Sequence, residues 1–255
     1  MKKGFNIELT VDFTIEWFKK ITSTNDLCQR KVEQGVSEGL VIAAEYQEQG
    51  RGQRGNTWES QERQNLTFSV LLRPTFLAVT EQFYLSKLTA LAITDWLNTF
   101  VIKEMVRIKW PNDIYVGDKK ICGILIENSS SKSNLESSVI GIGINLNQTV
   151  FTDELPNPTS LLLETGKRVD PETILPEVVS CIGGRYQQLV EGNKAAIDND
   201  YFNAIYRKDL LSKYYSNGVE FEATIIGIKP TGELILKTSK DEIKTFAFKE
   251  VTFII

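Results

Sequence analysis

The residue types that could do chemistry gather first in the segment 45–58, EYQEQGRGQRGNTW. Two arginines, Arg51 and Arg54, alternate there with three glycines at positions 50, 52 and 55. Glycine lets the backbone approach a ligand closely, and the guanidinium group of arginine binds carboxylates and phosphates. The segment therefore indicates an anion-binding loop, although a solvated surface loop can have the same composition. Its spacing is neither that of a Walker loop nor that of a dinucleotide-binding fingerprint.

A second candidate is Lys109, which ends the apolar stretch 106–109 directly before Trp-Pro-Asn-Asp at 110–113. Because proline lacks a backbone donor and Asn-Asp favours a turn, the strand is expected to break there. A lysine in an apolar strand is costly to bury unless an anion meets it. A lysine on the solvated side of an edge strand is the alternative interpretation.

Two further segments carry groups beside which a ligand could bind. Gly141 and Gly143 interrupt the apolar stretch 139–146, and glycines inside a buried strand commonly mark a ligand or another backbone lying against the sheet. Ser23 or Thr24 is placed to cap a helix. Hydroxyls and amides at a helix start also bind small polar ligands, so both interpretations stay open.

Composition excludes several classes of function. The 255 residues contain no histidine, which removes histidine-dependent triads, histidine-ligated zinc and imidazole acid–base chemistry. A net charge of −4 argues against a nucleic-acid partner. The three scattered cysteines fit a reducing compartment, and neither a signal peptide nor a membrane-spanning apolar run is found. We expect a cytoplasmic protein without a membrane partner.

The remaining pattern predicts the elements that must position these residues. We expect strands at 6–13, 17–21, 39–44, 65–73, 106–116 with the break, 119–127 and 139–146, and helices at 24–34, 80–100, 160–164, 171–191 and 199–212. The serine-rich stretch 128–138 is expected to be a loop. From residues 213–217 onward, strands at 219–228, 232–238 and 243–248 predict a small barrel-like module that must pack on its neighbour.

Five ordered motifs together resemble the biotin protein ligase family. They are Ser23-Thr24-Asn25, then Glu45-Tyr-Gln47 leading into Gly50-Arg51-Gly52-x-Arg54-Gly55-x-x-Trp58, then Lys109-Trp-Pro-Asn112-Asp113, Lys120-x-x-Gly123-Ile-Leu, and Gly141-Ile-Gly143-Ile-Asn145. Their order makes the match specific. The resemblance runs from about residue 15 to the C-terminus and implies an α+β fold. It consists of a mixed β-sheet flanked by helices, like that of class II aminoacyl-tRNA synthetases, in a catalytic domain of residues 1–213, and a small SH3-like β-barrel of residues 214–255.

The resemblance implies a ligase with a two-step reaction. Biotin's carboxylate attacks the α-phosphate of ATP and releases pyrophosphate, and an acceptor lysine of a biotin carboxyl carrier protein then takes the acyl group from biotinyl-5′-AMP. Mg²⁺ is expected to accompany ATP. Joining two anions requires cations and amide donors more than a nucleophile or general base, so the lack of histidine is no obstacle. A homodimer is compatible with the resemblance.

The same resemblance implies a role for each matched position. Lys109, Arg51 and Arg54 are the implied catalytic cations, and no residue is implied as a metal ligand. The positions matched to biotin binding are Ser23, Thr24, Asn25, Gln47, Gly50, Arg51, Lys109, Gly123, Gly141 and Gly143. The positions matched to ATP or the adenylate are Arg51, Arg54, Trp58, Lys109, Asn112 and Asn145. Asp113 would orient the acceptor lysine or a metal-bound water, unless it only forms the turn.

The chain departs from the family pattern at Gln53 and Asn56, where arginine is usual, and Gln53 predicts weaker retention of the adenylate. The catalytic strands begin almost at residue 1, so we expect no DNA-binding domain of the kind that bifunctional members carry. Two other functions stay open. A lipoate or octanoate ligase or transferase shares the fold, and a non-catalytic regulator would bind biotin or nucleotide without exchanging pyrophosphate.

Overall fold

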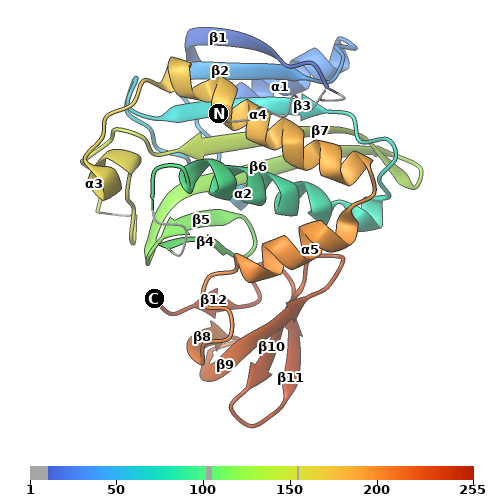
Figure 1. Cartoon of the computed structure of the whole chain (residues 1–255), viewed down its shortest axis with the longest axis vertical. Coiled ribbons are helices and arrows are strands. Elements are labelled where there is room, and N and C mark those ends of the chain that lie inside the picture. Colours follow the sequence, from blue (N-terminus) through green and yellow to red (C-terminus); the bar gives the residue numbers. More distant parts are fainter. Residues whose placement is uncertain (1–10, 102–104, 154) are drawn as a thin grey trace, which may run out of the picture.

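The computed structural model describes residues 11–101, 105–153 and 155–255, without the side chain of Arg54, and contains two β-sheets (Figure 1). The larger sheet has seven strands in the order β1-β2-β3-β7-β6-β5-β4. Their bounds are β1 Thr14–Ile21, β2 Leu40–Gln47, β3 Leu66–Leu72, β4 Val106–Lys109, β5 Asp113–Val116, β6 Lys119–Ser131 and β7 Asn134–Ile144. β1 and β2 run parallel and the other neighbours antiparallel, so the predicted mixed sheet is confirmed.

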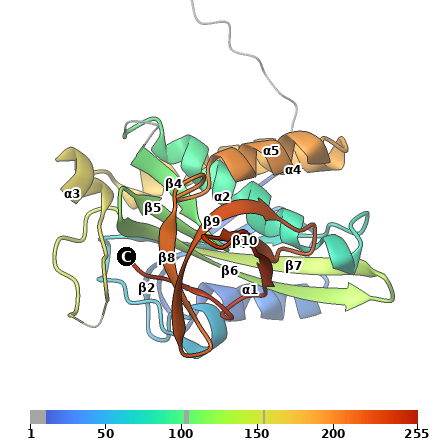
Figure 2. The ribbon, with the colours of Figure 1, turned by 90° about the horizontal axis from the view of Figure 1, so that it is seen from below.

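Helices cover both faces of this sheet (Figure 2). On one face, α1 Thr24–Glu33 packs on β2, β3 and β7. On the other, α2 Phe83–Leu97 packs on β4, β5 and β6 and is covered by α4 Pro171–Val190 and α5 Lys194–Asn203. Because α2 lies between the sheet and these helices, it is buried along nearly its whole length. Three short helices lie in connections, η1 Gln53–Gly55, η2 Val79–Glu81 and α3 Leu161–Thr165.

Two predicted segments differ from the structure. The serine-rich stretch 128–138 is not a loop, because β6 and β7 continue through it as a hairpin. Leu135, Ser137 and Ser138 of β7 are buried, and the Ser129 and Ser137 hydroxyls lie 2.7 Å apart across the strands. Paired hydroxyls thus replace the apolar alternation that marks other strands.

The helix expected at 199–212 is also wrong in its bounds, since α5 spans Lys194–Asn203. The chain then lies along edge strand β4, where Ile108 N donates to Ala204 O at 2.8 Å and Tyr206 N donates to Ile108 O at 2.9 Å. These bonds take the place of further helical turns. Of the strand expected at 6–13, residues 6–10 lie outside the described residues, and residues 11–13 precede β1.

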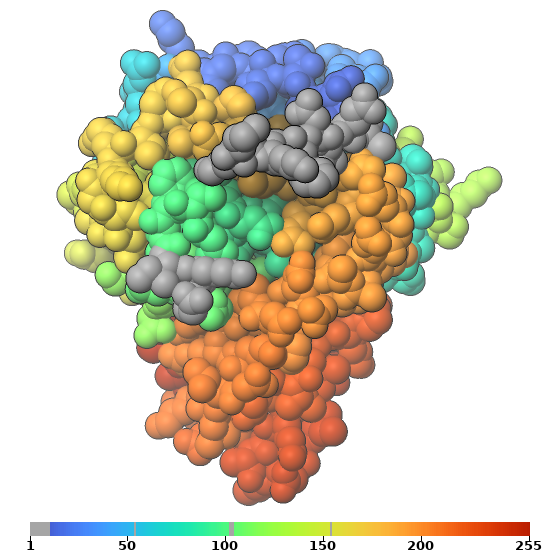
Figure 3. Space-filling view, in the orientation of Figure 1, coloured from blue at the N-terminus to red at the C-terminus, as the bar shows by residue number. Residues whose placement is uncertain are grey.

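The second sheet is antiparallel and five-stranded, in the order β11-β10-β9-β8-β12, which confirms a small C-terminal β-module. Its strands are β8 Ser212–Ser216, β9 Val219–Ile228, β10 Leu234–Thr238, β11 Ile243–Phe246 and β12 Thr252–Phe253. It forms the narrow end of the molecule, next to α5 (Figure 3). The division into domains at residue 213 stays a prediction. Within the described residues, no helix is both long and apolar enough to cross a membrane.

Candidate active site

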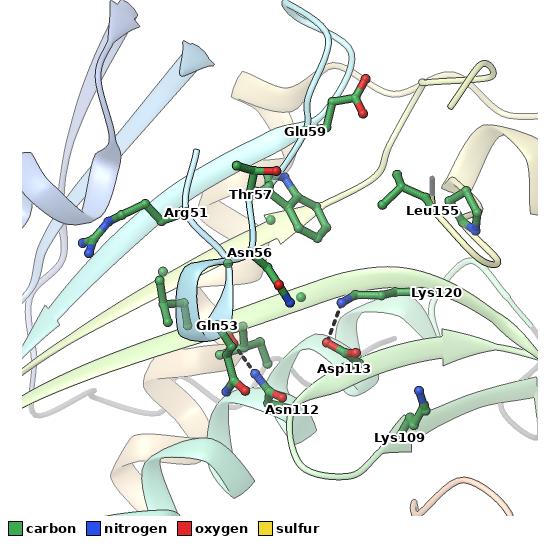
Figure 4. Close-up of a pocket in the computed structure, with 18 of the residues that line it drawn as sticks. Arg51, Gln53, Asn56, Thr57, Glu59, Lys109, Asn112, Asp113, Lys120 and Leu155 are labelled. Carbon is green, nitrogen blue, oxygen red and sulfur yellow. Dashed lines mark hydrogen bonds and ion pairs between the residues drawn. The ribbon is translucent and has the colours of Figure 1, made fainter. Parts of the chain in front are cut away.

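A cavity of about 1030 Å³ lies between the larger sheet, the 50–58 loop, the 110–113 turn and the last strand of the second sheet (Figure 4). Its wall includes most of the residues that the sequence assigned to substrate binding. These are Ser23, Thr24, Asn25, Gln47, Arg51, Trp58, Lys109, Asn112, Gly123, Gly141, Gly143 and Asn145. Gly50 is not on this wall, and the side chain of Arg54 lies outside the described residues.

The glycine-rich loop folds back on itself as a short hairpin. Trp58 N donates to Gly50 O at 2.9 Å, and Gly52 N donates to Asn56 O at 2.7 Å. A Cβ atom on Gly50 would lie 2.3 Å from Trp58 O, so this close approach requires glycine. Gly50 therefore supports the site by folding the loop, which carries Trp58 over the sheet.

The indole of Trp58 lies on a pair of glycines that face each other across β6 and β7. Gly123 and Gly143 are cross-strand partners, and a Cβ atom on Gly143 would lie 2.2 Å from Trp58 Cε2. The indole Nε1 has no hydrogen-bond partner among the described residues. Gly123 and Gly143 thus leave room for the flat ring of Trp58, whereas the sequence analysis expected a ligand or another backbone beside Gly141 and Gly143.

A chain of hydrogen-bonded polar side chains, buried at Thr24, Asn25 and Ser69, forms one end of the cavity. Thr24 N donates to Gln47 Oε1 at 2.7 Å, Ser69 Oγ lies 2.5 Å from Asn25 Oδ1, and Asn25 Nδ2 donates to Glu127 Oε2 at 2.8 Å. Because the Glu127 carboxylate only accepts hydrogen bonds, the amide nitrogen of Asn25 must face it, and this defines the orientation of Asn25. This end of the cavity presents fixed donors and acceptors.

Arg51 extends this chain with two carboxylates. Its guanidinium contacts Glu127 at 2.7 and 3.0 Å and Asp26 at 2.8 Å. Figure 4 shows Arg51 on the opposite side of the cavity from Lys109, Asp113 and Lys120. In this conformation Arg51 is balanced by protein carboxylates, and its contact with substrate anions stays a prediction.

Two further cations of the wall, Lys120 and Lys109, lie together across the cavity. Lys120 Nζ forms an ion pair with Asp113 Oδ1 at 2.7 Å and lies 5.9 Å from the centre of the Trp58 ring. Lys109 Nζ lies 3.2 Å from the Tyr115 hydroxyl and 5.6 Å from the centre of the Phe253 ring. Burial lowers the pKa of Lys109, although the charge of Asp113 acts in the opposite direction.

This burial leads to a prediction for pH dependence. Above its lowered pKa, Lys109 loses the ammonium charge, whereas arginine stays protonated. The Lys109→Arg variant should therefore keep kcat/KM for ATP to a higher pH than the wild type, because kcat/KM reports groups of the free enzyme. Alkaline limbs at the same pH in both proteins would show that Lys109 does not control this limb.

Two residues predicted to contact the adenylate donate hydrogen bonds to backbone carbonyls of the protein. Asn112 Nδ2 donates to Ile124 O, and Asn145 Nδ2 donates to Thr159 O at 2.9 Å. Both side chains are buried. Their bonds hold the 110–113 turn and the 159 segment in place, and direct contact with the nucleotide stays a prediction.

Sequence reasoning missed four residues of the site, Ser69, Tyr115, Glu127 and Phe253, and assigned no role to Lys120. Ser69 left a signal, as a polar residue on a fully buried strand that would need a partner. The sequence contains no such signal for Glu127, because a carboxylate at the end of a predicted strand is usually exposed to solvent. Phe253 is far along the chain, and only the packing of the second sheet brings it to Lys109.

Comparisons with known proteins agree with this geometry. The model of the Biotin/lipoate A/B protein ligase family matches residues 17–145. The chain is 30% identical over 235 residues to the bifunctional ligase/repressor BirA of Bacillus subtilis, covering 86% of this chain and 68% of that protein. It is 30% identical over 212 residues to the biotin–[acetyl-CoA-carboxylase] ligase of Paracoccus denitrificans, covering 81% and 88%.

Among solved structures, the biotin protein ligase of Aquifex aeolicus in complex with biotin and ATP matches with a TM-score of 0.76 and 29% identity, over 93% of this chain and 97% of that one. The chain belongs to the biotin/lipoate A/B protein ligase family. The Paracoccus denitrificans and Aquifex aeolicus proteins are both named as biotin ligases. The predicted family, fold class and ligase activity are therefore confirmed.

Proposed function

We propose that this cavity carries out biotin activation and transfer in two steps. Biotin's carboxylate displaces pyrophosphate from the α-phosphate of ATP, and the lysine of a carrier domain then displaces AMP. The observation that carries the proposal is one cavity with a fixed polar chain at one end and two lysines at the other. An uncharged polar head group and a polyanion are complementary to these two ends.

The two ends of the cavity would have different roles, one binding biotin and the other stabilising phosphate charge. Thr24, Asn25 and Gln47 would bind the ureido head of biotin, since they offer both donors and acceptors. Lys109 and Lys120 would stabilise the negative charge that develops on the α-phosphate, because preorganised cations in a shielded site lower the barrier most. Asp113, which is paired with Lys120, would hold that ammonium in place.

Mg²⁺ is proposed as part of the substrate, bound to the phosphates of ATP. Within the described residues, no group of three or more Cys, Asp or Glu side chains could hold a metal ion. Asp113, the carboxylate nearest the lysines, is already in an ion pair. The described residues therefore do not fit a resident metal ion.

Carrier modification tests the proposal. The protein, ATP, Mg²⁺ and biotin should add one biotinyl group to a biotin carboxyl carrier domain, seen as a mass increase, and a carrier whose acceptor lysine is arginine should stay unmodified. Lipoate and octanoate, offered in parallel, should give no product. Modification by lipoate or octanoate in place of biotin would assign the cavity to the other branch of the family.

Gln53 lies on the cavity wall where the family usually has arginine. Glutamine supplies no charge to the acyl phosphate, so we expect the wild type to release more free biotinyl-5′-AMP than the Gln53→Arg variant does. The difference should be roughly tenfold, the size of one charge-assisted hydrogen bond. The measurement is the rate at which free adenylate accumulates in solution without carrier, and equal rates for both proteins would contradict this role.

A further inference from the structure

The second sheet supplies part of the cavity wall through its last turn and strand. Lys249, Val251, Thr252 and Phe253 line the cavity together with residues of the larger sheet. Phe253 is nearly buried and lies over the ammonium of Lys109. The C-terminal sheet therefore belongs to the site itself, which raises the question of what Lys249 does there.

Packing fixes the turn that carries Lys249, which lies between β11 and β12. The Phe248 ring centre lies 5.3 Å from that of Trp110 and 5.8 Å from that of Phe83. Glu250 closes the turn, because Glu250 Oε2 accepts from Ala247 N at 2.7 Å. Lys249 is thus an exposed side chain on a fixed backbone, between an anchored aromatic ring and the buried Val251.

The turn is also tied to the segment that follows Lys109. Trp110, which packs on Phe248, donates its Nε1 hydrogen to Gly232 O at 2.8 Å. The two lysines are therefore carried on segments that contact each other directly. Packing therefore fixes the backbone of Lys249 relative to that of Lys109, and no ion pair between side chains is needed for this.

On the described part of the cavity wall, some cations form ion pairs with carboxylates and others do not. Arg51 is paired with Glu127 and Asp26, and Lys120 with Asp113. For Lys109 and Lys249 the described residues provide no ion pair, although both line the same cavity. Two ammonium groups without an ion pair in one cavity attract a ligand with several negative charges.

We propose that Lys249 is a further substrate-contacting residue, which binds the β- and γ-phosphates of ATP and the pyrophosphate formed from them. Lysine binds phosphate as a point charge and does not need the planar geometry of arginine. The inference rests on the proposed function, since it assigns to Lys249 the leaving group of the first step. The sequence analysis predicted no role for Lys249.

The backbone of Lys249 allows a clean test. Its φ of 70° is left-handed, a conformation that asparagine adopts more easily than lysine. Lys249→Asn should therefore remove the charge without lowering the melting temperature. In biotin-dependent ATP–pyrophosphate exchange, we expect KM for ATP and for pyrophosphate to rise roughly tenfold, with KM for biotin unchanged. Lys249→Arg should restore both values.

A matched control and two opposing outcomes complete the experiment. Lys240→Asn changes an exposed lysine of the same sheet that is not on the cavity wall, and should exchange like the wild type. Unchanged KM for ATP and pyrophosphate in Lys249→Asn would overturn the assignment. So would a defect confined to transfer onto the carrier, which would place Lys249 on the carrier's docking surface. A wild type without biotin-dependent exchange would instead refute the proposed function.

Discussion

The Lys120→Ala variant is expected to lose about 100-fold of the biotin-dependent exchange rate, a loss typical of removing one preorganised transition-state contact. Lys120 is the cation whose ammonium lies between Asp113 and the ring of Trp58 on the cavity wall. Its removal also leaves the carboxylate of Asp113 unpaired at the place where phosphate charge develops. The variant should therefore lose kcat more than affinity for biotin.

Lys119 provides the matched control for this prediction. It precedes Lys120 in β6, its side chain is 60% exposed, and it forms only a loose ion pair with Glu164 at 3.7 Å. Exposed pairs of this kind contribute little, so Lys119→Ala should retain wild-type exchange. Equal rates for the two variants would remove Lys120 from the catalytic group and leave its ion pair as a structural contact.

The Gly141→Ala variant should raise KM for biotin by about 100-fold or abolish measurable binding, the range seen when a buried polar network loses its geometry. A Cβ atom at Gly141 would lie 2.1 Å from Asn25 Oδ1. Asn25 cannot move aside freely, because Ser69 and Glu127 hold its two amide atoms. The methyl group must therefore displace the side chain that fixes the head-group end.

Gly227 is the control for this substitution. It also lies within a strand, β9, but a Cβ atom there would meet its nearest neighbour, Ile235 Cδ1, at 3.5 Å, an ordinary contact. Gly227→Ala should leave biotin binding unchanged in calorimetry. If Gly141→Ala binds biotin as tightly as Gly227→Ala does, the polar chain around Asn25 is not the head-group site.

Local pattern predicted most of the fold, because the buried strands and helices carry clear apolar periods. The strand at 66–72 and the helix at 83–97 lie inside the predicted ranges. The apolar pattern did not predict two segments whose conformation depends on contacts with other parts of the chain. The 128–138 hairpin is stabilised by paired serines, and the segment after Asn203 is held by bonds to β4 in place of its own helical bonds.

The site was predicted where one short motif contains the relevant residues, and missed where distant segments meet. Thr24, Gln47, Lys109 and Gly141 all line the cavity, as expected. Phe253 reaches it only through the packing of the second sheet. Glu127 contacts the wall residues Asn25 and Arg51 only because of strand register, and a single sequence encodes neither relation locally. The carboxylates around Arg51 could not be predicted for the same reason, because Asp26 lies in α1 and Glu127 in β6.

The central claim is that the polar and cationic ends of one cavity join biotin to ATP. Incorporation of labelled pyrophosphate into ATP, with and without biotin, tests it most directly because no carrier is needed. We predict exchange that depends on biotin and falls about 100-fold in Lys120→Ala. Biotin binding by calorimetry without any exchange would contradict the account and indicate a regulator that binds biotin but does not activate it.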